Sequence, residues 1–129
     1  MNKSKQAISV LIVEDEPSLN DAYKRILESE RIDVRSSFNG REALDELKSM
    51  QPDVILLDLK MPVMDGIEFL QKLPKTKAAG KAKVIIFSNY DEQAEIKDAF
   101  ALGATKYMLK AWASPSEVVK VVKEVVNSD

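Results

Sequence analysis

Three acidic residues follow two short apolar segments of this 129-residue chain without any intervening loop. Glu14 and Asp15 come directly after Ser9–Val13, and Asp58 comes directly after Val54–Leu57. Both segments are rich in valine, isoleucine and leucine, which is typical of strands that are buried on both faces of a parallel sheet. Because the carboxyl ends of parallel strands lie at one edge of their sheet, we expect the three carboxylates to lie close together.

Two later apolar segments end in a polar residue in the same way. Residues 84–87 are followed by Ser88, and residues 107–109 are followed by Lys110. If all four segments belong to one parallel sheet, a hydroxyl and an ammonium join the carboxylates at the same edge. Such a set of groups can bind a divalent cation and accept a phosphoryl group.

Carboxylates that are packed together repel one another, and a hard dication such as Mg²⁺ relieves that repulsion. We expect Asp15 and Asp58 to be direct ligands of Mg²⁺. Glu14 would bind the ion through water or tune the local field, and the backbone carbonyl of Lys60 would complete the protein's share of the ligands.

Phosphoryl transfer assigns a role to each of the three catalytic candidates. Asp58 is the expected nucleophile, because a carboxylate can form an acyl phosphate. The Lys110 ammonium would hold a phosphate oxygen as a point charge, and the Ser88 hydroxyl would donate a hydrogen bond to another.

Helical segments alternate with the apolar ones. An alternating pattern at Ile32–Ser36 predicts an additional half-exposed edge strand. The helices are expected at Leu19–Ser29, Arg41–Met50, Gly66–Leu73, Glu92–Leu102 and Ser116–Val126. Their ends are marked by the cap pairs Asn39 with Glu42 and Ser114 with Glu117, by Asp91 as an N-cap, by the turn Asp65–Gly66 and by Gly103 as a stop.

The order strand–helix, repeated five times, predicts a doubly wound parallel sheet with helices on both faces. We expect residues 1–129 to form one domain with a core at about 8–127, since no linker or low-complexity segment interrupts the pattern. The formal net charge of −2 gives no reason to expect nucleic-acid binding. No apolar stretch approaches the roughly 20 residues that a membrane span needs.

The chain contains no cysteine and no histidine. Disulfides, thiolate metal sites and imidazole catalysis are therefore excluded. The absence of cysteine fits a reducing cytoplasm, and we expect a cytoplasmic protein that does not act on membranes or nucleic acids.

These residues resemble those of response-regulator receiver domains, including the chemotaxis regulators of two-component signalling. The resemblance rests on Glu14–Asp15, the segment Asp58–Gly66, Ser88, Tyr107 and Lys110, and it covers about Val10 to Val126. It implies a flavodoxin-like sheet in the strand order 2-1-3-4-5 with five helices. It also implies that a sensor histidine kinase or a phosphotransfer protein donates a phosphoryl group from its phosphohistidine to Asp58.

The resemblance further implies a switch that acts on a downstream protein target, which the sequence does not identify. Ser88 would move toward the phosphoryl group and Tyr107 would turn inward. The surface of the fourth helix, fifth strand and fifth helix would then change its affinity for partners. Such a domain is a signalling phosphoacceptor rather than an enzyme, although it catalyses its own phosphorylation and a slow autodephosphorylation.

One residue, Ala111, departs from the family pattern, and two others suggest a hypothesis about the lifetime of the phosphorylated state. Ala111 follows Lys110 where the family usually has a proline in a cis peptide. Because a cis bond before alanine costs about 3 kcal/mol or more, we expect a trans bond or a strained cis bond held by its surroundings. Lys60 and Tyr90, two positions beyond Asp58 and Ser88, are expected to control the lifetime of the phosphorylated state by limiting access of water.

Other interpretations remain for several residues. Asp15 or Asp58 alone could be a helix cap or a solvated loop residue. Ser88 alone could be a turn residue, Lys110 a surface lysine and Tyr107 a half-buried strand aromatic. A basic segment with lysines at 72, 75, 77, 81 and 83 is either a solvated loop or a site for an acidic partner, and Trp112 either covers the start of the last helix or anchors a partner.

Two other functions compete with that of a signalling phosphoacceptor. A phosphohydrolase with an aspartate nucleophile resembling the haloacid dehalogenase group would want an acidic residue where Lys60 stands. A flavin-binding module would need a phosphate-binding loop after the first strand, where Glu14–Asp15–Glu16 would instead repel phosphate.

Overall fold

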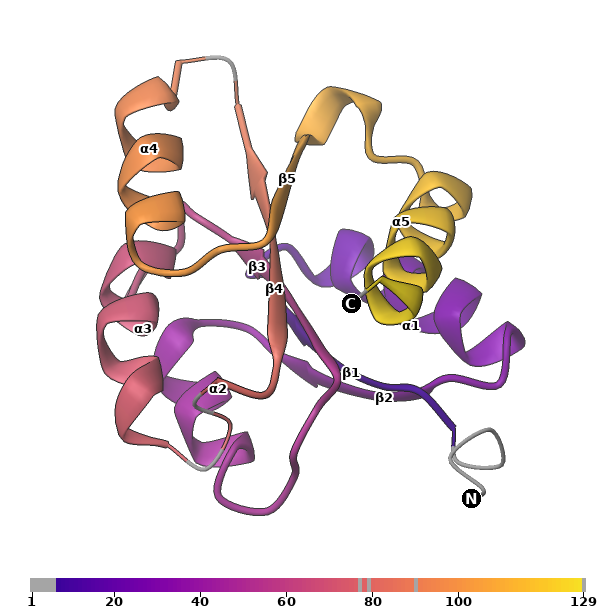
Figure 1. The fold of residues 1–129 in the computed structure, drawn as a ribbon. Coiled ribbons are helices and arrows are strands. Elements are labelled where there is room, and N and C mark those ends of the chain that lie inside the picture. Colours follow the sequence, from indigo (N-terminus) through magenta and orange to yellow (C-terminus); the bar gives the residue numbers. More distant parts are fainter. Residues whose placement is uncertain (1–6, 77, 79, 90, 129) are drawn as a thin grey trace.

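Five parallel strands form a single sheet that has helices on both faces (Figure 1). A computed structural model of the chain describes residues 7–76, 78, 80–89 and 91–128. The strands are β1 (Ser9–Val13), β2 (Asp33–Ser37), β3 (Val54–Asp58), β4 (Lys83–Ser88) and β5 (Lys106–Leu109). Their spatial order is β2-β1-β3-β4-β5, which confirms the predicted doubly wound, flavodoxin-like sheet.

The five helices alternate with the strands along the chain. They are α1 (Pro17–Ser29), α2 (Gly40–Glu46), α3 (Gly66–Lys72), α4 (Gln93–Ala101) and α5 (Pro115–Asn127). Two short 3₁₀ turns, η2 (Leu73–Lys75) and η3 (Lys110–Trp112), follow α3 and β5. Within this described part, no helix is both long enough and apolar enough to cross a bilayer.

Each face of the sheet packs against its own layer of helices, as Figure 1 shows. On one face, α2, α3 and α4 cover strand residues such as Leu11, Leu57 and Ile86. On the other face, α1 and α5 cover Ile12 and Leu56. Side chains of successive strand residues point to opposite faces, so strands buried on both sides have no polar side of their own. The polar groups are therefore confined to the strand ends.

The register of the strands brings those ends to one edge. Val13 pairs with both Ser37 of β2 and Leu57 of β3, so Glu14 and Asp58 follow directly from adjacent paired positions. Asp58 in turn pairs with Phe87, the residue before Ser88. The expected meeting of strand ends is thus present in the register itself.

Most predicted helix ends are confirmed by their hydrogen bonds. Asn39 Oδ1 accepts from the Glu42 amide at 2.9 Å, and Ser114 Oγ accepts from the Glu117 amide at 3.3 Å. Asp65 Oδ1 accepts from the Glu68 amide at 2.9 Å. Gly103 has a φ of 107°, a conformation that side chains rarely adopt, directly after the last turn of α4.

Three predicted boundaries are corrected. Asp91 is not the N-cap of α4; Glu92 holds that position, and its side chain makes no cap bond to the helix. Helix α2 ends at Glu46 and not at Met50. Pro52 disfavours helical backbone at the preceding residue, and the chain turns at 47–49 so that it can enter β3. The edge strand is shifted by one residue, to Asp33–Ser37.

Candidate functional site

Glu14, Asp15 and Asp58 lie together at the carboxyl-terminal edge of the sheet. Each offers one carboxylate oxygen, and the three oxygens lie within 4.8 Å of one another. Glu14 and Asp58 are buried, and Asp15 is partly exposed. The strand ends therefore bring together the acidic residues that the sequence predicts as a metal site.

The Asp58 carboxylate is held by two donors and is 2% exposed. Lys110 Nζ donates to Oδ2 at 2.9 Å, and the Lys60 amide donates to Oδ1 at 3.3 Å. Burial raises the pKa of Asp58 above its ordinary value, although both hydrogen bonds and the charge of Lys110 act against that rise. A cation bound here would stabilise the charged carboxylate, which burial has deprived of hydrating water.

Glu14 is fully buried, and its two oxygens have different surroundings. Oε2 accepts from the Glu16 amide at 3.0 Å. Oε1 has no hydrogen-bond partner among the described residues and lies 3.5 Å from Lys110 Nζ. Burial, followed by the nearby charge of Asp58, raises the pKa of Glu14 from 4.5 to about 7. This carboxyl group is poised to change its charge when a cation arrives.

Lys110 brings a positive charge to these buried carboxylates. Burial alone would lower the pKa of its ammonium, but the hydrogen bond and charge of Asp58, together with Glu14, raise that pKa above the ordinary value. Lys110 is followed by Ala111 through a trans peptide, since the described residues contain no cis bond. The trans prediction is confirmed, and the side chain still reaches Asp58.

The structure leaves the Ser88 hydroxyl without a partner and turns Tyr107 outward. Ser88 is fully buried at the end of β4, and its Oγ makes no hydrogen bond within the described part of the chain. Tyr107 is 44% exposed and contacts Phe100 of α4 edge to face, with ring centroids 6.2 Å apart. Buried hydroxyls are usually hydrogen-bonded, so the unsatisfied Ser88 suggests a ligand oxygen as its partner.

Lys60 lies at the rim of the site. Its ammonium is 3.4 Å from the Glu95 carboxylate of α4, and both side chains are substantially exposed. Its backbone amide contacts Asp58, so the residue lies directly beside the predicted phosphoacceptor. Tyr90, the other residue expected to limit water access, lies outside the described residues.

The turn after β3 depends on a close approach at Gly66. A Cβ at this position would lie 2.7 Å from the carbonyl oxygen of Asp58 and 2.8 Å from Leu59 Cα. The Gly66 amide also donates to the Leu59 carbonyl at 3.0 Å. Only glycine fits here without moving the backbone that carries Asp58.

Several supporting residues were missed by the sequence analysis. Asn20 Nδ2 bridges the carbonyls of Glu14 and Ser37 at 2.9 and 3.0 Å, which joins the ends of β1 and β2. Glu92 is buried and accepts from the Asn89 amide at 2.9 Å, which fixes the turn after Ser88. Asn20 is a polar residue on the otherwise apolar buried side of α1. That interruption of the apolar pattern is the feature of the sequence that could have pointed to it.

Tyr23 was also missed. Its hydroxyl donates to the Ala113 carbonyl at 3.0 Å, and its ring stacks on Phe87 with centroids 5.4 Å apart. Burial raises the pKa of Tyr23 to about 12, so the hydroxyl keeps its proton. This contact ties α1 to the segment that follows Lys110.

Comparison with known proteins places these features in one family. The family described as the response regulator receiver domain matches residues 10–123. The chemotaxis protein CheY of Thermotoga maritima is 32% identical over 117 residues, covering 90% of this chain and 95% of that protein. The nitrate/nitrite response regulator NarL of Escherichia coli is 30% identical over 94% of this chain, which spans only 56% of NarL.

Solved structures agree with the sequence relatives. The CheY-like receiver domain protein from Methanospirillum hungatei has a TM-score of 0.86 and 27% identity, with 95% of each chain covered. The Vibrio cholerae chemotaxis protein CheY4 has a TM-score of 0.84 and 26% identity, covering 93% of this chain and 99% of that one.

The raised pKa of Glu14 makes the metal-free protein less stable at higher pH. Folding takes up a proton between the unfolded pKa of 4.5 and the folded value of about 7, so stability is fully present below pH 4.5 and is lost as the pH rises through 7. The loss attributable to Glu14 is about 3 kcal/mol. We expect Glu14→Gln to flatten this dependence, as measured by urea unfolding from pH 4.5 to 8 with chelator present.

The exposed Glu28 provides the control, because Glu28→Gln removes the same charge from the surface of α1. Glu28→Gln should keep the slope of the parent protein. An equally steep slope in Glu14→Gln would contradict the assignment of this pH dependence to Glu14.

Proposed function

Since this chain belongs to the response regulator receiver domain family, we propose that it accepts a phosphoryl group on Asp58 and thereby switches a protein-binding surface. The donor would be a phosphohistidine of a sensor histidine kinase or phosphotransfer protein. Residues 1–129 contain no histidine, so the donor imidazole would lie outside this domain. The observation that carries the proposal is the 2.9 Å contact between Lys110 Nζ and the buried Asp58 carboxylate, beside two further carboxylates.

The proposed transfer is a displacement at phosphorus. An oxygen of the Asp58 carboxylate forms the new phosphorus–oxygen bond, while the phosphorus–nitrogen bond to the donor imidazole breaks and its electron pair returns to the ring nitrogen. Asp58 must be ionised to attack, and Lys110 favours that form. As the transfer proceeds, the Lys110 ammonium is placed to hold a phosphoryl oxygen in place of Asp58 Oδ2.

The residues at the sheet edge fit Mg²⁺. Three carboxylate oxygens within 4.8 Å, one each from Glu14, Asp15 and Asp58, form a hard, oxygen-rich donor set, and Glu14 Oε1 has no hydrogen-bond partner among the described residues. Asp15, Asp58 and the Lys60 carbonyl would hold the ion, with Glu14 acting through water. When bound, Mg²⁺ would neutralise these carboxylates and stabilise charge on the phosphoryl group.

The switch would start at Ser88 and end on the face of α4, β5 and α5. Ser88 Oγ has no partner in the described residues, so a phosphoryl oxygen would satisfy it. Movement of Ser88 would free space for the Tyr107 ring, which now packs outward on Phe100. The downstream target on this face would be a protein, and we place the chain in the cytoplasm as a signalling module rather than a classical enzyme.

Phosphorylation can be tested directly by intact mass spectrometry after incubation with Mg²⁺ and acetyl phosphate. We expect the parent protein to gain one phosphoryl group and Asp58→Asn to gain none. Lys110→Ala should slow the gain at least about tenfold, because an electrostatic contact to the reacting group is lost. The exposed Lys97 offers a matched control, and Lys97→Ala should react as the parent does.

Two outcomes would contradict the proposal. Addition to Asp58→Asn would show that another residue is the acceptor. Continued multiple turnover of phosphorylated small molecules would instead support the phosphohydrolase alternative.

Lys60 should govern how long the phosphoryl group remains. After removal of the donor, we expect Lys60→Ala to lose the group faster by autodephosphorylation, because a side chain held by Glu95 at the rim no longer limits water. Intact mass measured over time gives the rate, with Lys97→Ala as the control. An unchanged rate after replacing both Lys60 and Tyr90 would contradict this role.

Ser88 should couple phosphorylation to Tyr107. We expect Ser88→Ala to be at least as stable as the parent, since it removes an unsatisfied buried hydroxyl, and to be phosphorylated on Asp58. The amide shifts of Tyr107 and Phe100 that phosphorylation causes in the parent should be largely lost in Ser88→Ala, as followed by ¹H–¹⁵N NMR spectra.

Ser88→Thr keeps the hydroxyl and serves as the conservative control. It should retain the shifts of Tyr107 and Phe100. Full-sized shifts in Ser88→Ala would contradict a role for Ser88 in the switch.

A further inference from the structure

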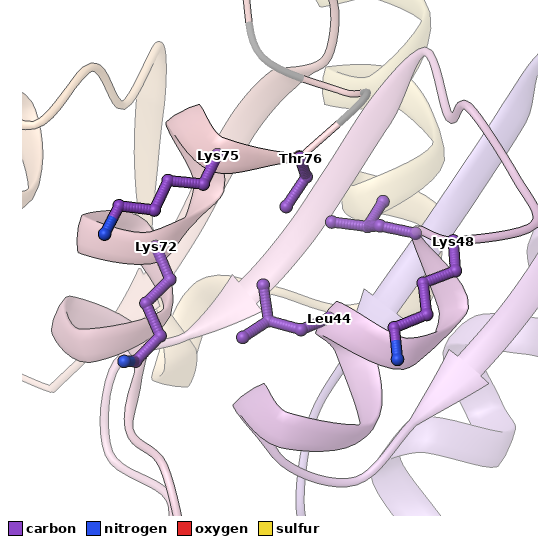
Figure 2. Close-up of a pocket in the computed structure, with 6 residues that line it drawn as sticks. Leu44, Lys48, Lys72, Lys75 and Thr76 are labelled. Atoms are coloured by element: carbon purple, nitrogen blue, oxygen red, sulfur yellow. The ribbon is translucent and has the colours of Figure 1, made fainter.

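Residues at the carboxyl-terminal parts of α2 and α3, and just beyond them, line a groove. These two helices lie on the face of the sheet away from α1 and α5 (Figure 1). Its volume is about 550 Å³, and it is lined by Leu44, Leu47, Lys48, Lys72, Lys75 and Thr76. Figure 2 shows Leu44 in the middle of the groove, with Lys48 on one wall and Lys72 and Lys75 on the other. We call this feature the α2–α3 groove.

The floor of the α2–α3 groove is apolar and recessed. Leu47 is 1% exposed, and Leu44 is partly buried against the same core cluster. A smaller hollow of about 200 Å³ lies beside the groove and shares Leu47 and Lys48 with it. The groove thus combines an apolar floor with lysine side chains at its rim.

The rim is positively charged and only partly compensated. Lys48 lies 3.2 Å from Asp45, but both side chains are more than two-thirds exposed, so the pair is screened by water. Lys72 and Lys75 have no ion pair with any residue that the structure describes. At least two ammonium groups are thus available to a ligand at the edge of an apolar floor.

We propose that the α2–α3 groove binds an acidic peptide segment of a partner protein. One apolar side chain of that segment would lie against the partly exposed Leu44, above the buried Leu47, and flanking carboxylates would lie against Lys48, Lys72 and Lys75. This assigns a partner to two lysines of the basic segment that the phosphoacceptor site does not use.

The shape favours a peptide over an anionic membrane. Membrane binding needs apolar side chains that project into the lipid, whereas Leu47 is recessed beneath the lysines. Exposed acids on the same two helices, Glu42 and Glu68, would repel a negatively charged plane. A narrow segment can enter the groove without approaching them.

The groove also lies away from the phosphoacceptor edge. Gly40 and Gly66 begin α2 and α3 beside the carboxyl ends of the strands, whereas Lys48 and Lys75 lie beyond the ends of these helices. Binding at the groove is therefore independent of chemistry at Asp58. Failure of one proposal does not entail failure of the other.

The test uses a fluorescein-labelled peptide that has leucine and phenylalanine between two pairs of glutamates, titrated with the full chain. We expect saturable binding and shifts of the amides at 44–48, 72–73 and 75–76 in ¹H–¹⁵N spectra. Lys72→Glu combined with Lys75→Glu should weaken binding at least about tenfold. Asp58→Asn should bind as the parent does, which separates this result from the phosphorylation assay.

Controls address net charge and the apolar floor. Lys24→Glu with Arg31→Glu makes the same change in net charge on the α1 side and should leave affinity within about twofold. A peptide with serines in place of leucine and phenylalanine should bind much more weakly. Urea unfolding confirms that each variant is folded.

Three outcomes would overturn the proposal. The first is no saturable binding of the parent protein. The second is equal binding by the Lys72/Lys75 and Lys24/Arg31 charge variants. The third is that the parent protein binds phosphatidylserine vesicles but not the peptide, and that the Lys72/Lys75 variant no longer binds the vesicles. The groove would then be a lipid site.

Discussion

The burial of two neighbouring carboxylates, those of Glu14 and Asp58, is the constraint on which the site depends. Two buried carboxylates at adjacent strand ends share one nearby ammonium, that of Lys110. That single cation does not offset their burial, so the pKa values of both acids remain raised. The resulting cost, about 3 kcal/mol for Glu14, is a large part of the stability of a small domain. A fold that keeps this arrangement must hold the strand ends firmly from elsewhere.

The rest of the sheet edge provides that support through backbone contacts. Asn20 holds the carbonyls of Glu14 and Ser37, and Gly66 lets the chain turn back closely against Asp58. Glu92 fixes the turn after β4 through the Asn89 amide. These contacts restrain the main chain, while Glu14 Oε1 and Ser88 Oγ keep no hydrogen-bond partner among the described residues. Rigid support beneath incompletely satisfied polar groups is the arrangement that a ligand-binding edge requires.

The sequence alone could predict the sheet and the acidic cluster because both follow from local patterns. Apolar runs that end abruptly in Glu14, Asp58, Ser88 and Lys110 determine which groups reach the edge once the strands are parallel. The supporting residues could not be predicted, since Asn20 and Glu92 act on backbone atoms of distant or folded-back segments. The cap of α4 was wrongly assigned to Asp91 because an acid before a helix has the same local pattern whether it caps the helix or not.

The carboxylate edge and the α2–α3 groove differ in what they cost the stability of the fold. The difference arises because the edge lies at the carboxyl ends of the strands, whereas the groove lies at the carboxyl ends of α2 and α3. At the carboxyl ends of the strands, buried carboxylates lie together at a cost to stability. At the other ends of the helices, Lys72 lies in the last turn of α3, where a positive charge interacts favourably with the unpaired carbonyls. Lysines can therefore surround the α2–α3 groove without the burial cost that Glu14 and Asp58 carry. Under the two proposals, the α2–α3 groove is a permanently formed binding surface, whereas phosphorylation at the carboxylate edge would alter the separate face of α4, β5 and α5.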